Sequence, residues 1–125
     1  MYKIESIGEN QFYVKIMGEF PPAEASDCSN DFQEKIKNST SVSVIVDLLD
    51  VAIIKIKSLD IIITLLNTTK KKLNKSAFVL PFSPPLTEEI KYVFKKSHSP
   101  RRKIVNTLEE GKEWTGISAI TLKGD

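Results

Sequence analysis

The sequence contains few of the residues that serve as covalent staples or as catalytic groups. Among 125 residues there are one cysteine, one histidine and one tryptophan. A single cysteine excludes an intrachain disulfide, which fits a reducing compartment. Cys28 and His98 cannot form a zinc site by themselves. The five glycines form neither a phosphate-binding nor a dinucleotide-binding pattern. We therefore expect no metal and no cofactor.

Long uncharged apolar runs are also missing. The first ten residues alternate polar and apolar side chains and lack the apolar core of a signal peptide. The most hydrophobic stretch, residues 43–67, carries five charged residues, too many for a membrane span. We therefore expect a cytoplasmic protein. With 41% hydrophobic and 27% charged residues, the chain has the composition and length of one globular domain, residues 1–125.

The net charge of +2 conceals an uneven distribution. Residues 1–50 hold 9 acidic and 4 basic residues, a net charge of −5. Residues 51–103 hold 3 acidic and 12 basic residues, a net charge of +9. Such a dipolar surface can steer an acidic partner, although charges spread evenly around a solvated surface would give the same count.

Residues 2–6 and 12–17 alternate polar and apolar side chains around the turn residues 8–10, which predicts an antiparallel hairpin. Gly18 ends the second strand. From Ala23 onward, apolar residues recur at helical spacing up to Ile36, which predicts an amphipathic helix with Cys28 on its buried face. Burial rather than reactivity is expected for Cys28, because no basic neighbour is evident to stabilise a thiolate.

Residues 43–67 are the centre of the predicted fold. Val44–Val46 is a β-branched run typical of a strand buried on both faces. Further on, Leu59, Ile62, Ile63 and Leu66 follow helical spacing, although Ile61–Ile63 also favour a strand. We predict a helix here. The turn between this strand and helix lies where ligands and partners usually meet an α/β domain.

The remaining elements follow the same pattern. Residues 77–80 and 103–105 are predicted strands. A helix is predicted from Ser83 as its N-cap to about Ser97, and another from Thr107 as its N-cap to Trp114, with Gly116 placed to end it. Residues 117–122 are left open between a strand and a docked tail. The order predicts an α/β fold, a small mixed β-sheet of four to five strands with α-helices packed mainly on one side.

The pattern resembles the STAS domain family (sulfate transporter and anti-sigma-factor antagonist), including its SpoIIAA-like branch. The resemblance covers most of the chain. It is carried by Gly18, the strand IVDL, the strand–turn–helix of residues 43–67, and the segments LPFSPPLTEEIKYVF and KIVNTLEEGKEW. It implies a small mixed sheet with helices mainly on one side. It also implies a non-catalytic regulatory role with a protein partner, such as a kinase-like anti-sigma factor or a transporter component.

The family's switch motif is altered in this chain. In the anti-sigma-factor antagonists the turn after the central strand is Asp-Ser-Ser-Gly-Leu, and its second serine is phosphorylated by a partner kinase. The corresponding residues here are Lys55-Ile56-Lys57-Ser58-Leu59. This alignment puts Lys57 at the phosphoserine position and Ser58 at the glycine position. A one-residue slip would instead make Ser58 the phosphorylated residue, at the cost of a deletion in the turn.

The residues of this turn have structural interpretations as well. Ser58 is interpreted as the N-cap of the helix, with Asp60 in the first turn complementing the helix dipole. Lys55 and Lys57 either face solvent or form a basic rim that holds an anion or an acidic partner. The candidate partner-binding residues are therefore Lys55, Lys57, Ser58 and Asp60.

A second candidate site is the strongest basic cluster of the sequence. Its members are Lys95, Lys96, Arg101, Arg102 and Lys103. They could contact an anionic small molecule or the phosphates of anionic lipid. Nucleic acid is not expected, because no aromatic residue is interleaved for stacking on bases. A solvated loop, with His98 as a surface imidazole, is the alternative interpretation.

Enzymatic chemistry is not expected. A hydrolytic triad would need His98 beside a poised nucleophile and an orienting acid, and no such motif is visible. Trp114 is expected in the core, with an exposed partner anchor as the alternative. Three hypotheses result: a non-catalytic protein-interaction module using the central turn, an anion- or lipid-binding domain using residues 95–103, and an anti-sigma-factor antagonist switched at Ser58.

Overall fold

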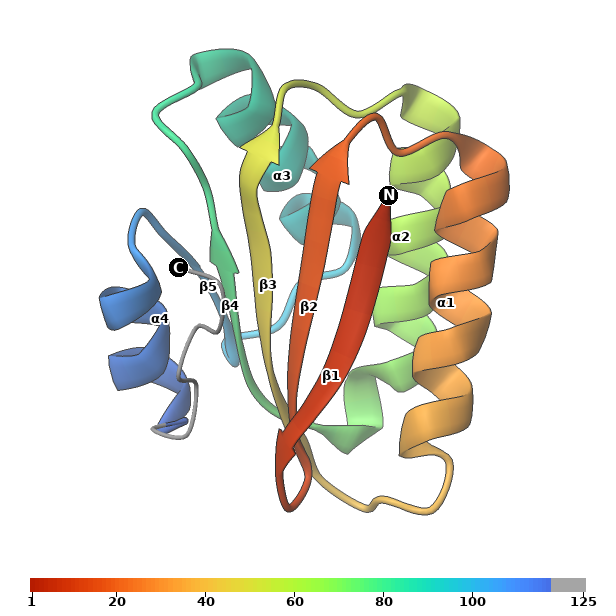
Figure 1. Ribbon diagram of the computed structural model, residues 1–125, viewed down its shortest axis with the longest axis vertical. Helices are drawn as coiled ribbons and strands as arrows, with labels where there is room; N and C mark the ends of the chain where they lie inside the picture. Colours follow the sequence, from red (N-terminus) through yellow and green to blue (C-terminus); the bar gives the residue numbers. More distant parts are fainter. Residues whose placement is uncertain (118–125) are drawn as a thin grey trace.

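The computed structural model describes residues 1–117, in which one five-stranded sheet carries helices on both faces (Figure 1). The strands are β1 Tyr2–Gly8, β2 Gln11–Gly18, β3 Val42–Val51, β4 Leu73–Val79 and β5 Arg102–Val105. The helices are α1 Pro22–Ile36, α2 Ile56–Thr69, α3 Pro84–Lys96 and α4 Leu108–Thr115, and a short 3-10 turn covers Lys70–Lys72.

The strands lie in the order β1-β2-β3-β4-β5. β1 pairs with β2 antiparallel, and the other three pairs are parallel. Each parallel neighbour is reached through a helix, as crossover connections require. The α/β class, the mixed sheet and the strand count predicted from the sequence are confirmed.

The helices divide unequally between the two faces of the sheet. Buried side chains of α1, α2 and α3 join one face in a single apolar cluster. The other face carries a smaller cluster, against which Leu108 and Trp114 of α4 pack (Figure 1). The prediction that helices pack mainly on one side is therefore confirmed.

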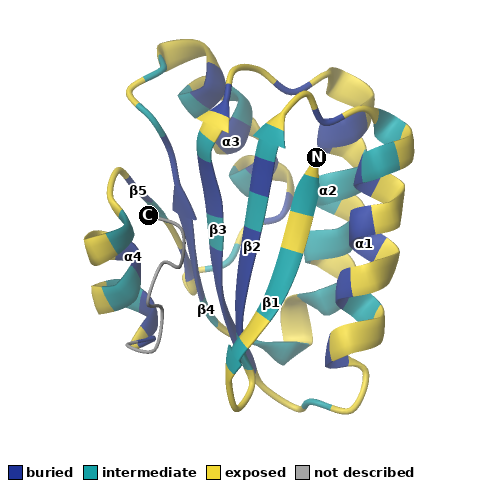
Figure 2. Ribbon diagram, in the orientation of Figure 1, coloured by how far each residue is buried: buried dark blue, intermediate teal, exposed yellow. Residues whose placement is uncertain are grey.

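β3 is buried on both faces, as its β-branched sequence predicts. Val44 and Leu48 face the cluster with α1–α3, and Ile45 faces the cluster with α4. Because successive side chains of a strand alternate, one strand supplies both cores. Figure 2 shows β3 largely in the buried colour. The strand extends to Val51, further than the sequence pattern alone indicated.

Local signals set several element boundaries. Gly18 and Gly116 both adopt left-handed conformations, with φ of 65° and 76°, and end β2 and α4. The Ser83 side chain accepts a hydrogen bond from the Leu86 amide, and Thr107 accepts one from the Glu110 amide at 3.1 Å. The N-caps predicted for α3 and α4 are confirmed. Ile117 is buried, and the open question about residues 118–122 lies outside the described residues.

None of the helices within residues 1–117 is long and apolar enough to cross a membrane.

We predict that Ile90→Ala in α3 destabilises the fold by about 2–5 kcal/mol, because truncating a fully buried isoleucine leaves a void. Urea denaturation followed by circular dichroism measures the change. Lys91→Ala on the exposed side of the same helix is the matched control and should change stability by less than about 0.5 kcal/mol. Equal, small effects would contradict the packing of α3 against the sheet.

Candidate functional site

The carboxyl edge of the parallel sheet is the candidate site. β3 ends at Val51, and residues 52–55 lead into α2, whose N-cap is Lys55 in an extended conformation. Ile54 anchors this loop: its side chain is buried, and its amide donates a hydrogen bond to Glu89 Oε1 of α3 at 3.1 Å. Ile54 thus holds the loop against the fold, and the residues on either side of it, Ile53 and Lys55, are exposed.

Ser58 does not cap α2, and this interpretation of the sequence is wrong. It is the third residue of the helix, fully buried, and its Oγ donates to the Phe20 carbonyl at 2.6 Å. The N-cap residue, Lys55, offers no side-chain acceptor. Asp60 is exposed and lies beyond the first turn, so it does not serve the dipole role assigned to it. Ser58 instead joins the start of α2 to the β2–α1 loop.

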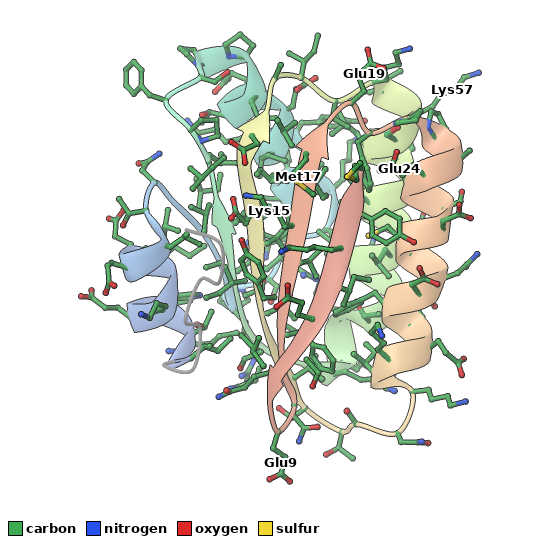
Figure 3. The ribbon with its side chains drawn as sticks, viewed as in Figure 1. Glu9, Lys15, Met17, Glu19, Glu24 and Lys57 are labelled. Atoms are coloured by element: carbon green, nitrogen blue, oxygen red, sulfur yellow. The ribbon has the colours of Figure 1, made fainter. Side chains whose placement is uncertain are left out.

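The structure separates the four candidate partner-binding residues. Lys55, Lys57 and Asp60 are exposed, whereas Ser58 is buried. In Figure 3, Lys57 lies at the end of the molecule where Glu19 follows β2, and Glu9 marks the opposite end. The exposed N-terminus of α2 adds the positive end of a helix dipole to the two lysines.

Three exposed apolar residues at this edge are not evident from the sequence. Ile53 is 62% exposed, Ile56 is 59% exposed and Phe82, in the β4–α3 loop, is 99% exposed. β3 and β4 are parallel neighbours, so the loops that follow them leave the same edge of the sheet. We call Ile53, Lys55, Ile56, Lys57 and Phe82 the edge surface. No sequence signal distinguishes exposed Ile53 from buried Ile54, because the loop that holds them has no regular period.

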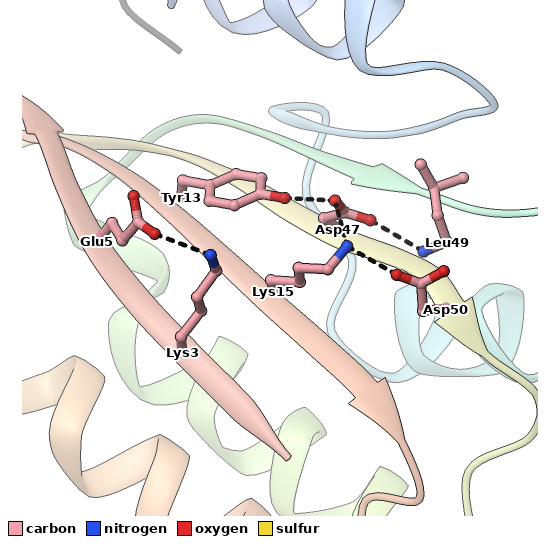
Figure 4. A network of polar contacts seen from close by, with 7 residues as sticks. All are labelled: Lys3, Glu5, Tyr13, Lys15, Asp47, Leu49 and Asp50. Carbon is pink, nitrogen blue, oxygen red and sulfur yellow. Dashed lines mark hydrogen bonds and ion pairs between the residues drawn. The ribbon is translucent and has the colours of Figure 1, made fainter. Parts of the chain in front are cut away.

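A second group missed from the sequence is a polar network on the sheet face not covered by α1–α3 (Figure 4). Asp47 of β3 is buried, accepts from the Tyr13 hydroxyl and accepts from the Leu49 amide at 3.0 Å. Lys15 Nζ lies 3.3 Å from Asp47 and 2.9 Å from Asp50. Burial alone would lower the pKa of Lys15, but the hydrogen bonds and charges of Asp50 and Asp47 raise it above its ordinary value. The Asp47 carboxylate is therefore fully occupied by contacts within the fold.

The basic cluster of residues 95–103 does not form one surface. Lys95, Lys96 and Arg101 are exposed, and Arg101 donates to the Asn74 carbonyl at 3.3 Å. Arg102 is buried beneath α2, where it donates to the Leu66 carbonyl, while the amine of Lys103 lies 5.3 Å from the Trp114 ring on the α4 side. The alternation of β5 sends neighbouring side chains to opposite faces. Anion binding by the exposed members stays a prediction, but one ligand cannot bridge all five.

The remaining candidate residues are Cys28, His98 and Trp114. Cys28 is buried against the core, and burial raises the pKa of its thiol to about 12. His98 is exposed. Trp114 is half-buried, and its indole N–H donates to the Ser76 carbonyl at 3.0 Å. Within residues 1–117, no three or more His, Cys, Asp or Glu side chains are grouped to hold a metal ion.

Comparison with known proteins identifies the fold. No family model matches the chain, and no curated protein matches it. Among solved structures, the anti-sigma factor antagonist SpoIIAA in its unphosphorylated form aligns with a TM-score of 0.69 at 10% identity, over 94% of this chain and 99% of that one. An anti-sigma factor antagonist from Mycobacterium paratuberculosis aligns with a TM-score of 0.69 at 14% identity, over 94% of each chain.

A third match is an uncharacterised protein of the DUF3478 family, with a SpoIIAA-like fold, from Shewanella loihica. It has a TM-score of 0.69 at 11% identity over 92% of each chain. The chain therefore has the SpoIIAA-like fold of STAS domains, and the resemblance stated from the sequence is confirmed at the level of the fold.

We predict that Lys15→Met destabilises the fold by about 1–3 kcal/mol, because the buried Asp47 carboxylate loses a charged partner. Lys3→Met is the matched control on the neighbouring strand, since its ion pair with Glu5 is exposed on both sides and should contribute less than about 1 kcal/mol. Urea denaturation of both variants checks the difference. If the two losses are equal, the contact of Lys15 with Asp47 in Figure 4 does not contribute specially to the stability of the fold.

Proposed function

We propose that this chain is a non-catalytic, regulatory protein-interaction module that binds an acidic partner protein through the edge surface. The observation that carries the proposal is the exposure of Ile53 and Ile56 in the same segment as Lys55 and Lys57, with Phe82 exposed on the loop that follows the neighbouring strand. Isolated exposed apolar residues are common, but three large ones on adjoining loops of one sheet edge are typical of a binding surface. The loops stand on a rigid base, because Ile54 and Ser58 fix the segment from within.

The charges of the edge surface favour an acidic partner. Two exposed lysines lie at the start of α2, Lys55 as its N-cap and Lys57 as its second residue, where the helix dipole is also positive. Positive side chains are slightly unfavourable at a helix N-terminus, so their presence favours recognition over stability. The apolar side chains would supply contact area, and the lysines would accelerate association and select the partner.

The fold supports the same function. Two of the structures with this fold are described as anti-sigma factor antagonists. By analogy, a regulatory role with a protein partner is proposed for this chain, with the edge surface as its contact region. The absence of a grouped metal site or reactive cysteine among residues 1–117 supports a non-catalytic role.

We further propose that the edge surface recognises its partner without a phosphorylation switch. In the alignment suggested by the sequence resemblance, Lys57 takes the position of the switch serine. The nearest serine, Ser58, is fully buried and bonded to the Phe20 carbonyl. A kinase would have to withdraw Ser58 from the core before transferring phosphate to it.

The partner-binding proposal predicts that Lys55→Glu with Lys57→Glu lowers affinity for the native partner about tenfold or more, equivalent to about 1.4 kcal/mol. A photo-reactive residue at Ile53 first identifies the partner in the native host, with the same residue at Glu9 as the control at the opposite end of the molecule (Figure 3). Binding of the purified partner is then measured by calorimetry at low and high salt.

The matched control is Lys70→Glu with Lys71→Glu, an equal charge change on exposed lysines beyond the other end of α2. It should leave affinity unchanged. Equal losses in both double variants would show a general charge effect, and unchanged affinity in both would contradict the edge surface as the binding site.

The absence of a switch predicts that Ser58→Asp destabilises the fold by more than about 3 kcal/mol, because it places an unpaired charge in the core. Lys57→Asp, one residue away and exposed, should change stability by less than about 0.5 kcal/mol. Thermal and urea denaturation give both values. Intact mass of protein from its native host should show no phosphate, and a phosphorylated Ser58 in folded protein would overturn the proposal.

A further inference from the structure

A cavity of about 80 Å³ lies between the sheet and helices α1 and α2. Strands β2, β3 and β4 form its floor, and the lining is almost entirely apolar. A single water needs about 10–15 Å³ measured in this way, so the space exceeds an ordinary packing defect. The position is in the main core of the molecule, away from the edge surface.

Helix α2 forms one wall of the cavity. Ile61, Ile62, Leu65 and Leu66 all line it, and each remains only half-buried. Ile90 of α3 also lines the cavity and is fully buried. Figure 2 shows little of α2 in the buried colour. The apolar side chains of α2 that face the cavity are therefore not fully covered by the sheet and the neighbouring helices.

Two polar side chains at one end of the cavity have unsatisfied hydrogen-bonding atoms. Ser76 and Arg102 are register partners on β4 and β5, both line the cavity, and they are 3% and 8% exposed. One Nη of Arg102 donates to the Leu66 carbonyl at 3.0 Å, but its Nε and the Ser76 Oγ have no hydrogen-bond partner. Other polar groups of the lining are satisfied: Ser29 accepts from Gln33 and Thr69 donates to Leu65.

The guanidinium of Arg102 has no counter-charge within residues 1–117. Among residues 1–117, no carboxylate lies within ion-pair distance of it. Burial lowers its pKa to about 10, and the group is still protonated at neutral pH. Buried charges in proteins are normally paired, and each unsatisfied buried group requires an explanation.

We propose that the cavity binds a short aliphatic monocarboxylate, with its carboxylate on Arg102 and Ser76 and its tail between α2 and the sheet. The Nε–H and a free Nη–H of arginine match the two oxygens of a carboxylate, and the serine hydroxyl adds a third donor. One positive charge balances one negative charge, which favours a carboxylate over a dianionic phosphate. The apolar walls, including Ile62 and Phe78, suit an alkyl chain.

The cavity volume limits the tail. It is about half of a 150 Å³ apolar cavity that admits benzene, so a chain of a few carbons is expected rather than a long fatty acid. This inference is independent of the proposed protein-binding role, because it concerns the core beneath α2 and not the edge surface.

The test titrates the purified full chain with butanoate, with acetate and 1-butanol as matched probes that lack the tail or the charge. Calorimetry gives affinities, and amide NMR shifts locate the site. Butanoate should bind at least tenfold more tightly than either probe and shift the amides of Ile62, Ser76 and Arg102. Dodecanoate should bind more weakly than butanoate, because its tail exceeds the cavity.

Arg102→Met should lower butanoate affinity at least tenfold while leaving butanol binding unchanged. Arg101→Met, the exposed neighbour, is the control and should leave both unchanged. Should Arg102→Met fail to fold, Ile62→Phe decides the question, since filling the cavity should weaken butanoate and butanol alike. No butanoate binding to the native chain, or binding unchanged in Arg102→Met, would overturn the proposal. Binding only to vesicles of anionic phospholipid, with no shift of the Ile62 amide, would overturn it too.

Discussion

The parallel pairing of β3 with β2 and β4 is the constraint on which the rest of the structure depends. β3 is hydrogen-bonded on both edges and buried on both faces, so it is the central strand of the sheet. Two crossover helices must then lie on the same face to return the chain to the start of each next strand. The β3–α2 turn is thereby fixed at the carboxyl edge, next to the β4–α3 loop.

Two buried contacts hold this edge in place. The Ser58 hydroxyl ties α2 to the β2–α1 loop, and the Ile54 amide ties the turn to α3. Residues 55–57 lie between these anchors and are exposed, and Ile53, just before the first anchor, is exposed as well. Apolar Ile53 and Ile56 thus face solvent in the same segment as the two lysines. Under the proposed function, this edge with its apolar and basic groups recognises its partner constantly. Reversible phosphorylation of Ser58 would first have to break its buried hydrogen bond to the Phe20 carbonyl.

Much of the fold could be predicted from local patterns, and the parts that could not have physical reasons. The hairpin, the four helices and the caps at Ser83 and Thr107 follow from periodicity and capping chemistry, which act over a few residues. Ser58 was misassigned because its partner, the Phe20 carbonyl, is 38 positions away in the sequence. The sequence groups Arg102 with its exposed neighbours Arg101 and Lys103. The reason is that β5 is a short strand at the end of a basic run, so the alternation of its side chains between the two faces is not evident. The exposure of Phe82 depends on the path of a loop, which no periodicity records.

Binding of a partner by the edge surface is tested most directly by hydrogen exchange of the chain with and without its native partner, because amide protection locates a contact without any substitution. If the edge surface binds the partner, protection on binding should be concentrated in residues 51–57 and 80–83. Protection confined to α4 or to β1, with those two segments unchanged, would contradict it.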